Sequence, residues 1–377
     1  MATENNNKNL NVPNLRFPEF GGEWECKKLG DIGTTLIGLT YSPQDVVPSD
    51  GTIVLRSSNI KGGLLDYTDL VRVNKKIKES IITRTNDILI CARNGSARLI
   101  GKNAILKDSD CGHTFGAFMM VYRSEDNPFV HQLLSTKRYY SQVAENLGAR
   151  INQITTSDLN SFEFSFPQSK KEKVKIASML SLLDERIATQ IKIIEKLESL
   201  IKGLCQKLTQ QDNPNTTLNE TLVCYSSTLQ ESSVQEVGDY PVYGATGVCG
   251  YTDAPEVDGD SILIIKDGAS VGVTYYASGK YSAIGTLNRL AAKRGYSLRY
   301  LYYCLKVFNF APYRTGLAIP HIYFRDYGKA KVWCPSLDEQ QRIADALTKV
   351  EQKIAMEKSI LEQLYSQKRF LLQAMFI

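Results

Sequence analysis

The sequence contains an internal repeat, and this repeat constrains the fold more than any other feature. Three segments of the first half match segments of the second half, the longest at an offset of 167 residues after one gap. In chain order, the matches are 87–95 with 260–268, 148–158 with 316–326, and 167–208 with 335–375. Such a repeat predicts two copies of one architecture, each a folded module followed by a long segment.

The two long segments predict helices that share one kind of apolar seam. Each follows a proline that ends an extended stretch, and apolar residues then recur at alternating spacings of four and three, the heptad pattern. The seam positions are Ile176, Leu180, Leu183, Ile187, Gln190, Ile194, Leu197, Ile201, Leu204 and Leu208 in the first copy, and Ile343, Leu347, Val350, Ile354, Glu357, Leu361, Leu364, Lys368, Leu371 and Met375 in the second. About 35 helical residues at roughly 1.5 Å each span ~50 Å.

Neither helix has enough apolar face to form a core alone, so each needs a partner. We predict that the two helices pair antiparallel as a coiled coil, with one module at each end. The alternative is that each is an ordinary amphipathic helix packed on its own module. The narrow seam favours the pair.

The modules have a mixed α/β pattern. Short apolar runs between turn signals predict strands, and longer amphipathic stretches predict helices at 129–146 and 298–308. The expected strands are 52–56, 87–91, 118–122, 162–167, 240–243, 261–265 and 330–335. We therefore predict two globular α/β domains and two long antiparallel helices in a pseudo-twofold repeat. The expected order is a first domain at 1–167, a helix at 168–210, a second domain at 211–334 and a helix at 335–377.

Composition and cysteine spacing argue against a disordered, a membrane-spanning and a zinc-binding protein. Of 377 residues, 43% are hydrophobic and 23% charged, as in globular proteins, so disorder is not the main content. No apolar run approaches the roughly 18–20 residues that span a bilayer, and the polar segment 1–11 lacks the apolar region of a signal peptide, so we expect a cytoplasmic protein. Eight cysteines without a C-x-x-C pair, and three histidines, argue against a zinc site.

Positive charge gathers in one stretch of each copy. The net charge is only +5, but residues 261–334 hold eleven Lys or Arg and two acids, and residues 72–107 hold nine against two. One basic stretch per copy is typical of a face that neutralises DNA phosphates. A solvated charged surface is the alternative for either stretch taken alone.

Side chains suited to base edges lie in the same modules. Arginine can bind guanine O6 and N7, and Asn or Gln can bind adenine N6 and N7. The candidate DNA-contacting residues are Arg56, Ser57, Asn59, Arg93, Asn94, Arg98, Arg150, Asn152 and Gln153 in the first copy, and Tyr243, Thr246, Lys266, Arg289, Arg314 and His321 in the second.

No catalytic motif accompanies these residues. Asn127-Pro128-Phe129 has one proline and no glycine-rich strand before it, unlike the loop of amino-methyltransferases, so we interpret it as a turn. The glycines of 244–250 lack G-x-G-x-x-G spacing, and no phosphate-binding G-x-x-x-x-G-K-[ST] occurs. We predict a binding protein with no catalytic residue and no metal site.

The layout resembles the specificity (S) subunit of type I restriction–modification systems over essentially the whole chain. The resemblance rests on the opening 12–31, on 238–247, and on Pro335, Glu339-Gln340 and Ile343-Ala344 at the second helix. The first copy departs from this pattern, with Glu172-Lys173 in place of Glu-Gln.

The resemblance implies two target-recognition domains that read a bipartite double-stranded DNA sequence, with the helices setting their separation. It also implies two methyltransferase (M) subunits that use S-adenosylmethionine, restriction (R) subunits that use ATP and Mg²⁺, and no cofactor in this chain. Two alternatives stay open: a stand-alone DNA modification enzyme or nuclease, and a coiled-coil interaction scaffold without a DNA role.

Overall fold

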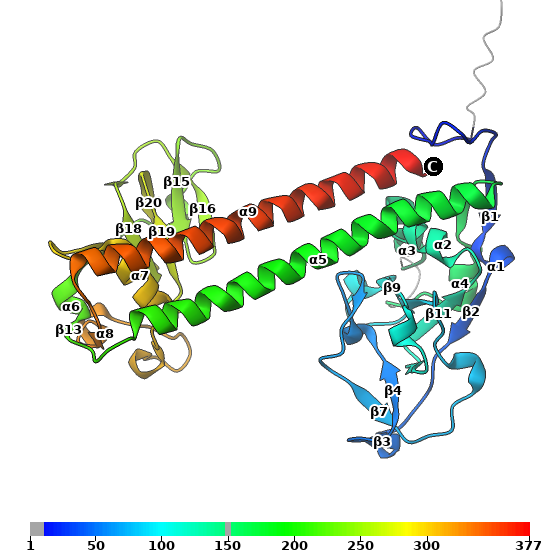
Figure 1. Cartoon of the computed structure of the whole chain (residues 1–377), viewed down its shortest axis with the longest axis horizontal. Coiled ribbons are helices and arrows are strands. Elements are labelled where there is room, and N and C mark those ends of the chain that lie inside the picture. Colours follow the sequence, from blue (N-terminus) through cyan, green and yellow to red (C-terminus); the bar gives the residue numbers. More distant parts are fainter. Residues whose placement is uncertain (1–10, 148–151) are drawn as a thin grey trace, which may run out of the picture. The chain divides into compact units, whose positions relative to one another are not determined.

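The computed structural model of the chain describes residues 11–147 and 152–377. It divides into two compact units (Figure 1). Unit 1 comprises Met1–Thr189 with Leu361–Ile377, and unit 2 comprises Gln190–Ile360. Each unit therefore contains one globular module and part of both long helices. The sequence predicts that each long helix is a separate segment between or after the domains. The compact units instead contain part of each long helix.

The two long helices form where the apolar seam predicts them. Helix α5 spans Lys170–Thr209 and helix α9 spans Leu337–Met375. Each begins just after a proline and a serine, and the Ser169 and Ser336 hydroxyls each accept a 3.4 Å hydrogen bond from the backbone N–H three residues on. Serine in this position satisfies a backbone donor that the first turn of a helix leaves free. The capping serine, which follows the proline directly in the second copy and after one residue in the first, therefore explains why both helices begin at equivalent positions.

The helices run antiparallel within each unit. In unit 1, the Lys368 ammonium lies 2.5 Å from an Asp184 carboxylate oxygen. In unit 2, the Lys358 ammonium lies 2.6 Å from a Glu198 carboxylate oxygen. In each unit, core residues from the start of one helix lie in the same cluster as core residues from the end of the other, which confirms the antiparallel pairing.

The polar seam positions have polar partners. Gln190 donates from Nε2 to the Glu357 backbone oxygen at 3.0 Å and also to the Glu357 carboxylate. These two residues are equivalent under the 167-residue offset, so the repeat places a residue of one helix against its own counterpart. The third polar position, Lys368, binds Asp184. A buried polar pair in a heptad seam favours one register over its alternatives.

Each module packs against the start of one long helix and the end of the other. In unit 1 the helix residues in the core are Ile176, Ala177 and Leu180 of α5, and Leu372 and Met375 of α9. In unit 2 they are Ile343, Ala344 and Leu347 of α9, and Ile201 and Cys205 of α5. The predicted pairing of the helices is therefore confirmed, and the helices also pack on the modules.

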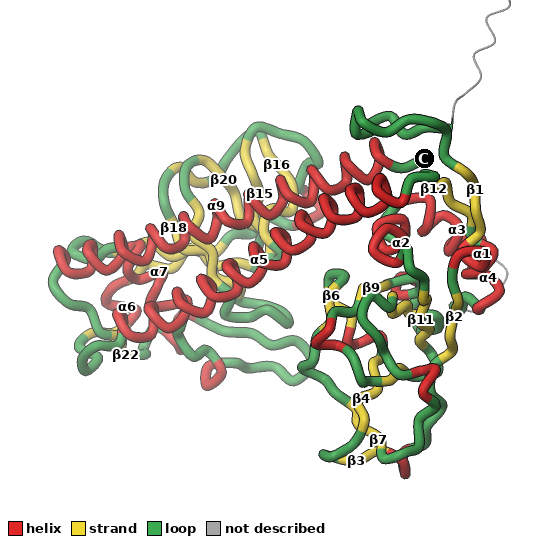
Figure 2. Tube along the Cα trace, turned by 45° about the vertical axis from the view of Figure 1, so that its right-hand side comes forward, coloured by secondary structure: helices red, strands yellow, loops and turns green. Residues whose placement is uncertain are grey.

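The module of unit 1 contains two four-stranded sheets. The central sheet has the order β2 (Thr34–Ile37), β11 (Met119–Arg123), β8 (Ile88–Cys91), β9 (Asn103–Ile105), with all neighbours antiparallel. The outer sheet has the order β10 (Thr114–Phe115), β4 (Thr52–Leu55), β7 (Val71–Val73), β3 (Val46–Val47). Strands β1 (Glu25–Lys28) and β12 (Glu163–Phe166) form a pair, as do β5 (Ile60–Lys61) and β6 (Leu64–Leu65). In both whole-chain views β4, β7 and β3 lie at the end of the module away from α5 (Figure 2).

The module of unit 2 repeats this plan. Its central sheet has the order β14 (Leu222–Ser226), β21 (Leu287–Ala292), β18 (Ser261–Ile265), β19 (Thr274–Ala277), and its outer sheet the order β16 (Gly247–Thr252), β15 (Tyr240–Gly244), β20 (Lys280–Ala283), β17 (Val257–Asp258). Strands β13 (Thr216–Thr217) and β22 (Lys331–Val332) form the remaining pair. The outer sheets share three strands and differ in where the fourth one pairs. Strand β3 pairs with β7 at one edge in unit 1, whereas β17 pairs with β20 at the opposite edge in unit 2.

Burial on both faces explains the continuous apolar runs of the central strands. Along β8, Ile88 and Ile90 pack toward the helices, and Leu89 and Cys91 pack toward the outer sheet. Along β18, Ile262 and Ile264 likewise pack toward the helices, and Leu263 and Ile265 pack toward the outer sheet. These two layers per module confirm the expected α/β class.

The short helices cover or cap the sheets. They are α1 (Leu29–Ile32), α2 (Asn127–Leu133), α3 (Lys137–Leu147), α4 (Thr156–Ser161), α6 (Leu218–Thr221), α7 (Leu298–Lys306) and α8 (Phe324–Tyr327). The single helix predicted at 129–146 is wrong, because it is two helices. The Thr136 hydroxyl donates to the Leu133 backbone oxygen at 2.6 Å, and the chain leaves the helix there before α3 begins.

Candidate nucleic-acid interface

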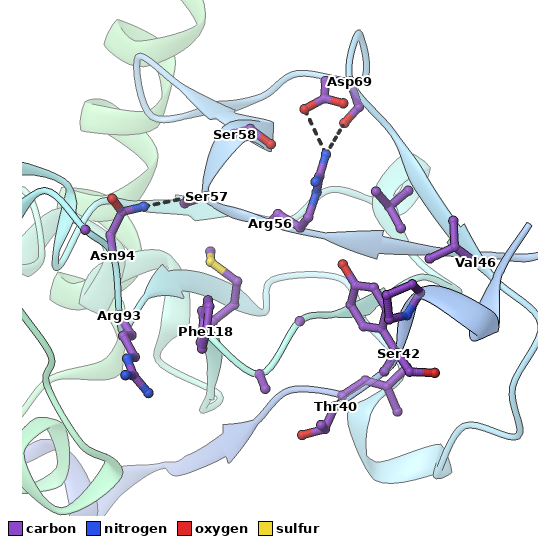
Figure 3. A pocket seen from close by; sticks show the side chains of 18 of the residues that line it. Thr40, Ser42, Val46, Arg56, Ser57, Ser58, Asp69, Arg93, Asn94 and Phe118 are labelled. Atoms are coloured by element: carbon purple, nitrogen blue, oxygen red, sulfur yellow. Dashed lines mark hydrogen bonds and ion pairs between the residues drawn. The ribbon is translucent and has the colours of Figure 1, made fainter. Parts of the chain in front are cut away.

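A hollow of about 1130 Å³ opens in unit 1 where loops from the two sheets meet. Five of the predicted DNA-contacting residues line it: Arg56, Ser57, Arg93, Asn94 and Asn152. The first two follow outer strand β4, and the next two follow central strand β8 (Figure 3). The fold thus brings together residues that are up to 96 positions apart in the sequence.

Hydrogen bonds fix the loops on one side of the hollow. The Asn94 Nδ2 donates to the Ser57 Oγ at 3.0 Å, which ties the loop after β8 to the loop after β4. The Arg56 guanidinium lies 2.8 Å from an Asp69 carboxylate oxygen, so an acidic residue partly neutralises this wall (Figure 3). The hollow therefore presents a preorganised mixture of donors and acceptors.

Arg93 differs from Arg56 because its guanidinium has no hydrogen-bond or ion-pair partner among residues 11–147 and 152–377. It is exposed, and its guanidinium carbon lies 5.2 Å from the centre of the Phe118 ring. A cation over an aromatic face is attracted to it while its N–H groups stay available. Arg93 is thus oriented without being neutralised.

Asn59 supports the loop from inside. Its side chain is fully buried, and its Nδ2 donates to the backbone oxygens of Asp66 at 3.0 Å and Asp69 at 2.8 Å. Its Oδ1 accepts from the Arg56 backbone N–H at 2.9 Å. In this arrangement the Asn59 amide is fully used by the loop, so it shapes the wall that carries Arg56.

Asn152 and the remaining candidates of the first copy have separate environments. Asn152 has a left-handed backbone (φ 42°) and donates from Nδ2 to the Gly95 oxygen at 3.0 Å. Gln153 forms an isolated β-bridge with Arg93. Arg98 is exposed on a short turn at Ala97–Leu99 and does not line the hollow. Arg150 lies outside the described residues.

Unit 2 brings together two of its predicted residues around a carboxylate. The His321 Nδ1 and the Lys266 ammonium lie 2.7 and 2.5 Å from the two oxygens of Asp267. Burial alone would raise the pKa of the Asp267 carboxyl, but the hydrogen bonds from His321 and Lys266 outweigh it and lower this pKa below its ordinary value. Asp267 is therefore an ionised acceptor at neutral pH.

The other four candidates of unit 2 have separate environments. Thr246 is exposed in the turn between β15 and β16, and Tyr243 is half-buried with its ring 5.6 Å from that of Tyr281. The Arg289 guanidinium lies 4.0 Å from the Tyr225 ring. Arg314 is exposed and donates to the Val271 oxygen at 3.1 Å.

Backbone hydrogen bonds show which residues of the two copies correspond. The Ile154 N–H donates to Ala92, and the Ile322 N–H donates to Lys266, both at 2.9 Å. The next residues form equivalent isolated β-bridges, Arg93 with Gln153 and Asp267 with His321. The structural counterpart of Arg93 is therefore Asp267. An ungapped match of 87–95 with 260–268 would instead place Lys266 opposite Arg93, and this alignment is wrong by one residue.

Sequence reasoning missed Asp267 and Phe118 as candidate site residues. Asp267 was left out because the search followed basic charge, and Phe118 because it opens an apolar run that predicts a buried strand. Phe118 lies just before β11 and is 60% exposed. The sequence feature that could have indicated an exposed Phe118 is its place directly after the small residues Gly116 and Ala117.

Several residues of the basic stretches form intramolecular hydrogen bonds or ion pairs. Lys75 pairs with Asp45 at 3.2 Å, and Lys102 donates to the Ser57 backbone oxygen at 3.3 Å. In unit 2, Lys293 donates to the Asn219 oxygen at 2.6 Å. The count of basic residues in each stretch thus overstates the charge available to a partner.

Among residues 11–147 and 152–377, no group of three or more His, Cys, Asp or Glu side chains is arranged to hold a metal ion. In the same part of the chain, no helix combines the length and apolarity needed to cross a membrane.

The model of one protein family, the type I restriction modification DNA specificity domain, matches residues 21–199 and 225–366. The chain belongs to this family. Each of the two matches covers most of one module and most of the long helix that follows it, so the family repeat coincides with the repeat seen in the fold.

Several specificity subunits are similar to this member of the family. The EcoKI specificity subunit of Escherichia coli K12 is 27% identical, and the StySPI subunit of Salmonella potsdam 26% identical, over 48% of this chain and 41% of each relative. A putative specificity subunit of Mycoplasma genitalium is 26% identical over 56% of this chain and 58% of its own length. The chain thus matches about two fifths of the length of the first two relatives.

Solved structures share the fold. An S subunit of a type I restriction–modification system from M. genitalium superimposes with a TM-score of 0.67 and 20% identity, over 97% of this chain and 99% of that one. A chain from a structure of type I restriction–modification complex assembly gives 0.52 and 15%, over 94% and 97%. The likeness supports the two-module α/β architecture with long helices.

Proposed function

We propose that this chain is the DNA-specificity subunit of a type I restriction–modification complex and that each module reads one half of a bipartite target. The observation that carries the proposal is the repetition of one module with polar, base-compatible side chains after its central strand, β8 or β18. Membership of a DNA specificity family supports the same interpretation.

The chemistry of the unit 1 hollow suits a DNA major groove. Arg93 offers N–H donors for guanine, and Asn94 and Asn152 carry amides of the type that binds adenine. Most contacts in such an interface go to phosphates, which orient the protein without reading sequence. In this proposal the exposed basic residues supply those contacts, and the hollow supplies discrimination.

We infer that the catalytic chemistry belongs to partner subunits. Two methyltransferase subunits with S-adenosylmethionine, and restriction subunits with ATP and Mg²⁺, would act on DNA that this chain selects, in the cytoplasm where the host DNA lies. The chain itself would be non-catalytic and hold no cofactor. Its contribution is to place the partners on a chosen sequence.

The test is selection of duplex DNA from a randomised library by the full chain purified with its methyltransferase partner. We expect two short enriched blocks separated by a gap of fixed length and indifferent sequence. Retention of DNA should fall steeply with salt, by roughly 10³–10⁵-fold between 50 and 200 mM if six to ten phosphates are contacted. One uninterrupted block would contradict the bipartite proposal.

Two outcomes would favour the alternatives. Methyl transfer or DNA cleavage by the purified chain alone would indicate an enzyme. Absence of salt-sensitive DNA retention by the complex would indicate a coiled-coil scaffold without a DNA role.

A further inference from the structure

One loop position has opposite hydrogen-bonding chemistry in the two modules. The segment after the central strand is held by equivalent backbone bonds, from Asn94 N–H to the Asn152 oxygen at 3.3 Å in unit 1, and from Gly268 N–H to the Pro320 oxygen at 2.9 Å in unit 2. The residue just before each of these donors is Arg93 or Asp267. Arginine only donates hydrogen bonds, whereas an ionised carboxylate only accepts them.

In unit 1, the surroundings leave Arg93 available to a ligand. Its side chain lines the hollow and lies beside the Phe118 ring (Figure 3), and its N–H groups bind no acceptor in the described part of the chain. The Phe118 ring restricts where the guanidinium lies, so less conformational freedom is lost when it binds. Its fork of donors matches the paired O6 and N7 acceptors of guanine.

In unit 2, the surroundings orient Asp267 as an acceptor. Its side chain is 26% exposed, so the carboxylate reaches the surface although both oxygens already accept one bond. His321 holds one oxygen, and its ring stacks on Tyr323 with a centroid separation of 6.5 Å. Each carboxylate oxygen can accept a second hydrogen bond. In the major groove, an amino donor occurs on cytosine N4 and adenine N6 but not on guanine or thymine.

We propose that this shared position selects opposite base edges in the two half-sites. Arg93 selects a guanine in the half-site read by unit 1. Asp267 selects a base with a major-groove amino group, cytosine or adenine, in the half-site read by unit 2, and His321 acts as its positioning residue. This inference rests on the proposed function and adds to it which residue sets which base.

The experiment repeats the library selection with the full chain and its methyltransferase partner, using Arg93→Ala and the isosteric Asp267→Asn. Arg93→Ala should make one guanine position degenerate and lower affinity for the wild-type site by roughly 5- to 150-fold, the range for one bidentate base contact. Asp267→Asn should relax or change one cytosine or adenine position of the other half-site. His321→Ala should weaken selection at that same position.

Matched controls separate base reading from loss of charge. Arg186→Ala removes an exposed arginine on α5, and Asp239→Asn alters an exposed acid of unit 2 outside the loop; both should leave every base preference unchanged. Two enriched blocks with preferences that none of the three loop variants alters would overturn this inference and leave the proposed function standing. Absence of any enriched block with the wild-type chain would overturn both.

Discussion

At the residue scale, where one copy of the repeat has a different residue from the other, the residue that it contacts differs as well. In unit 2, the buried Gln340 accepts from the Ser297 backbone N–H at 2.9 Å, at the start of α7. In unit 1, the equivalent Lys173 ammonium lies 2.5 Å from Asp126, at the start of α2. An ion pair thus replaces a neutral hydrogen bond, which explains why the first copy departs from the Glu-Gln pattern without losing the fold.

This exchange predicts a strong coupling between Lys173 and Asp126. Lys173→Gln alone should lower the free energy of unfolding of unit 1 by about 1–3 kcal/mol, because Asp126 loses the partner of a largely buried carboxylate. Lys173→Gln with Asp126→Ser should recover most of the loss by reproducing the neutral residues of unit 2. Urea unfolding of the full chain in a double-mutant cycle measures the coupling.

Additive effects of the two substitutions would contradict the coupling. The control is Lys175→Gln, which removes the more exposed pair with Glu19 on the same helix turn and should change stability by less than about 1 kcal/mol.

Residue types could be predicted for the site, but residue roles could not. Arginine and amides in loops indicated base contacts, and the fold gathers five of them in one hollow. Asn59 belongs to the same run of residues, yet it is fully buried, because burial depends on where Asp66 and Asp69 return in space. Asp267 was missed because the prediction followed basic charge, and because the match of 87–95 with 260–268 places Lys266, not Asp267, opposite Arg93.

At the element scale, the elements with a strong periodic signal were predicted most accurately. The long helices combine a heptad seam with a proline and a capping serine, and their observed ends lie within a few residues of those expected. The central strands are buried on both faces and so read as continuous apolar runs. The two-residue edge strands, such as β3 and β17, carry no such pattern and were not predicted.

The polar pair in the helix seam predicts a pH-dependent contribution to stability. The hydrogen bond from Lys353, followed by that from Gln190, lowers the pKa of Glu357 below its ordinary value. A carboxyl whose pKa is lower in the folded state stabilises the fold above the unfolded pKa, about 4.3, and this contribution is lost as pH falls through the folded value. Glu357→Gln should therefore be less stable than wild type at pH 7, and the difference should shrink below about pH 4.3.

Urea unfolding midpoints of the wild-type chain and of Glu357→Gln, taken between pH 7 and pH 3, measure this difference in stability. Glu362→Gln, an exposed substitution on the same helix, should show no such dependence. A difference between wild type and Glu357→Gln that stays constant from pH 7 to pH 3 would show that the charge of Glu357 does not act through this pair.

At the scale of the whole molecule, one framework carries two different surfaces. The central sheet and the helix starts are repeated, whereas the outer sheets gain their fourth strands at different edges and the loop position after the central strand holds Arg93 in one module and Asp267 in the other. A repeated framework with divergent loops is what reading two unlike half-sites requires. Under the proposed function, the long helices determine the distance between the half-sites.

The measurement that tests this account most directly lengthens both helices together. Seven residues are inserted at equivalent places, between Gln190 and Ile194 in α5 and between Glu357 and Leu361 in α9, so that the heptad seam stays in phase. Each helix grows by about 10 Å. Selection from the randomised library by the complex should then return the two wild-type half-site sequences with a longer gap, by up to about three base pairs. An unchanged gap, or altered half-site sequences, would contradict the claim that two independent modules are held apart by paired helices.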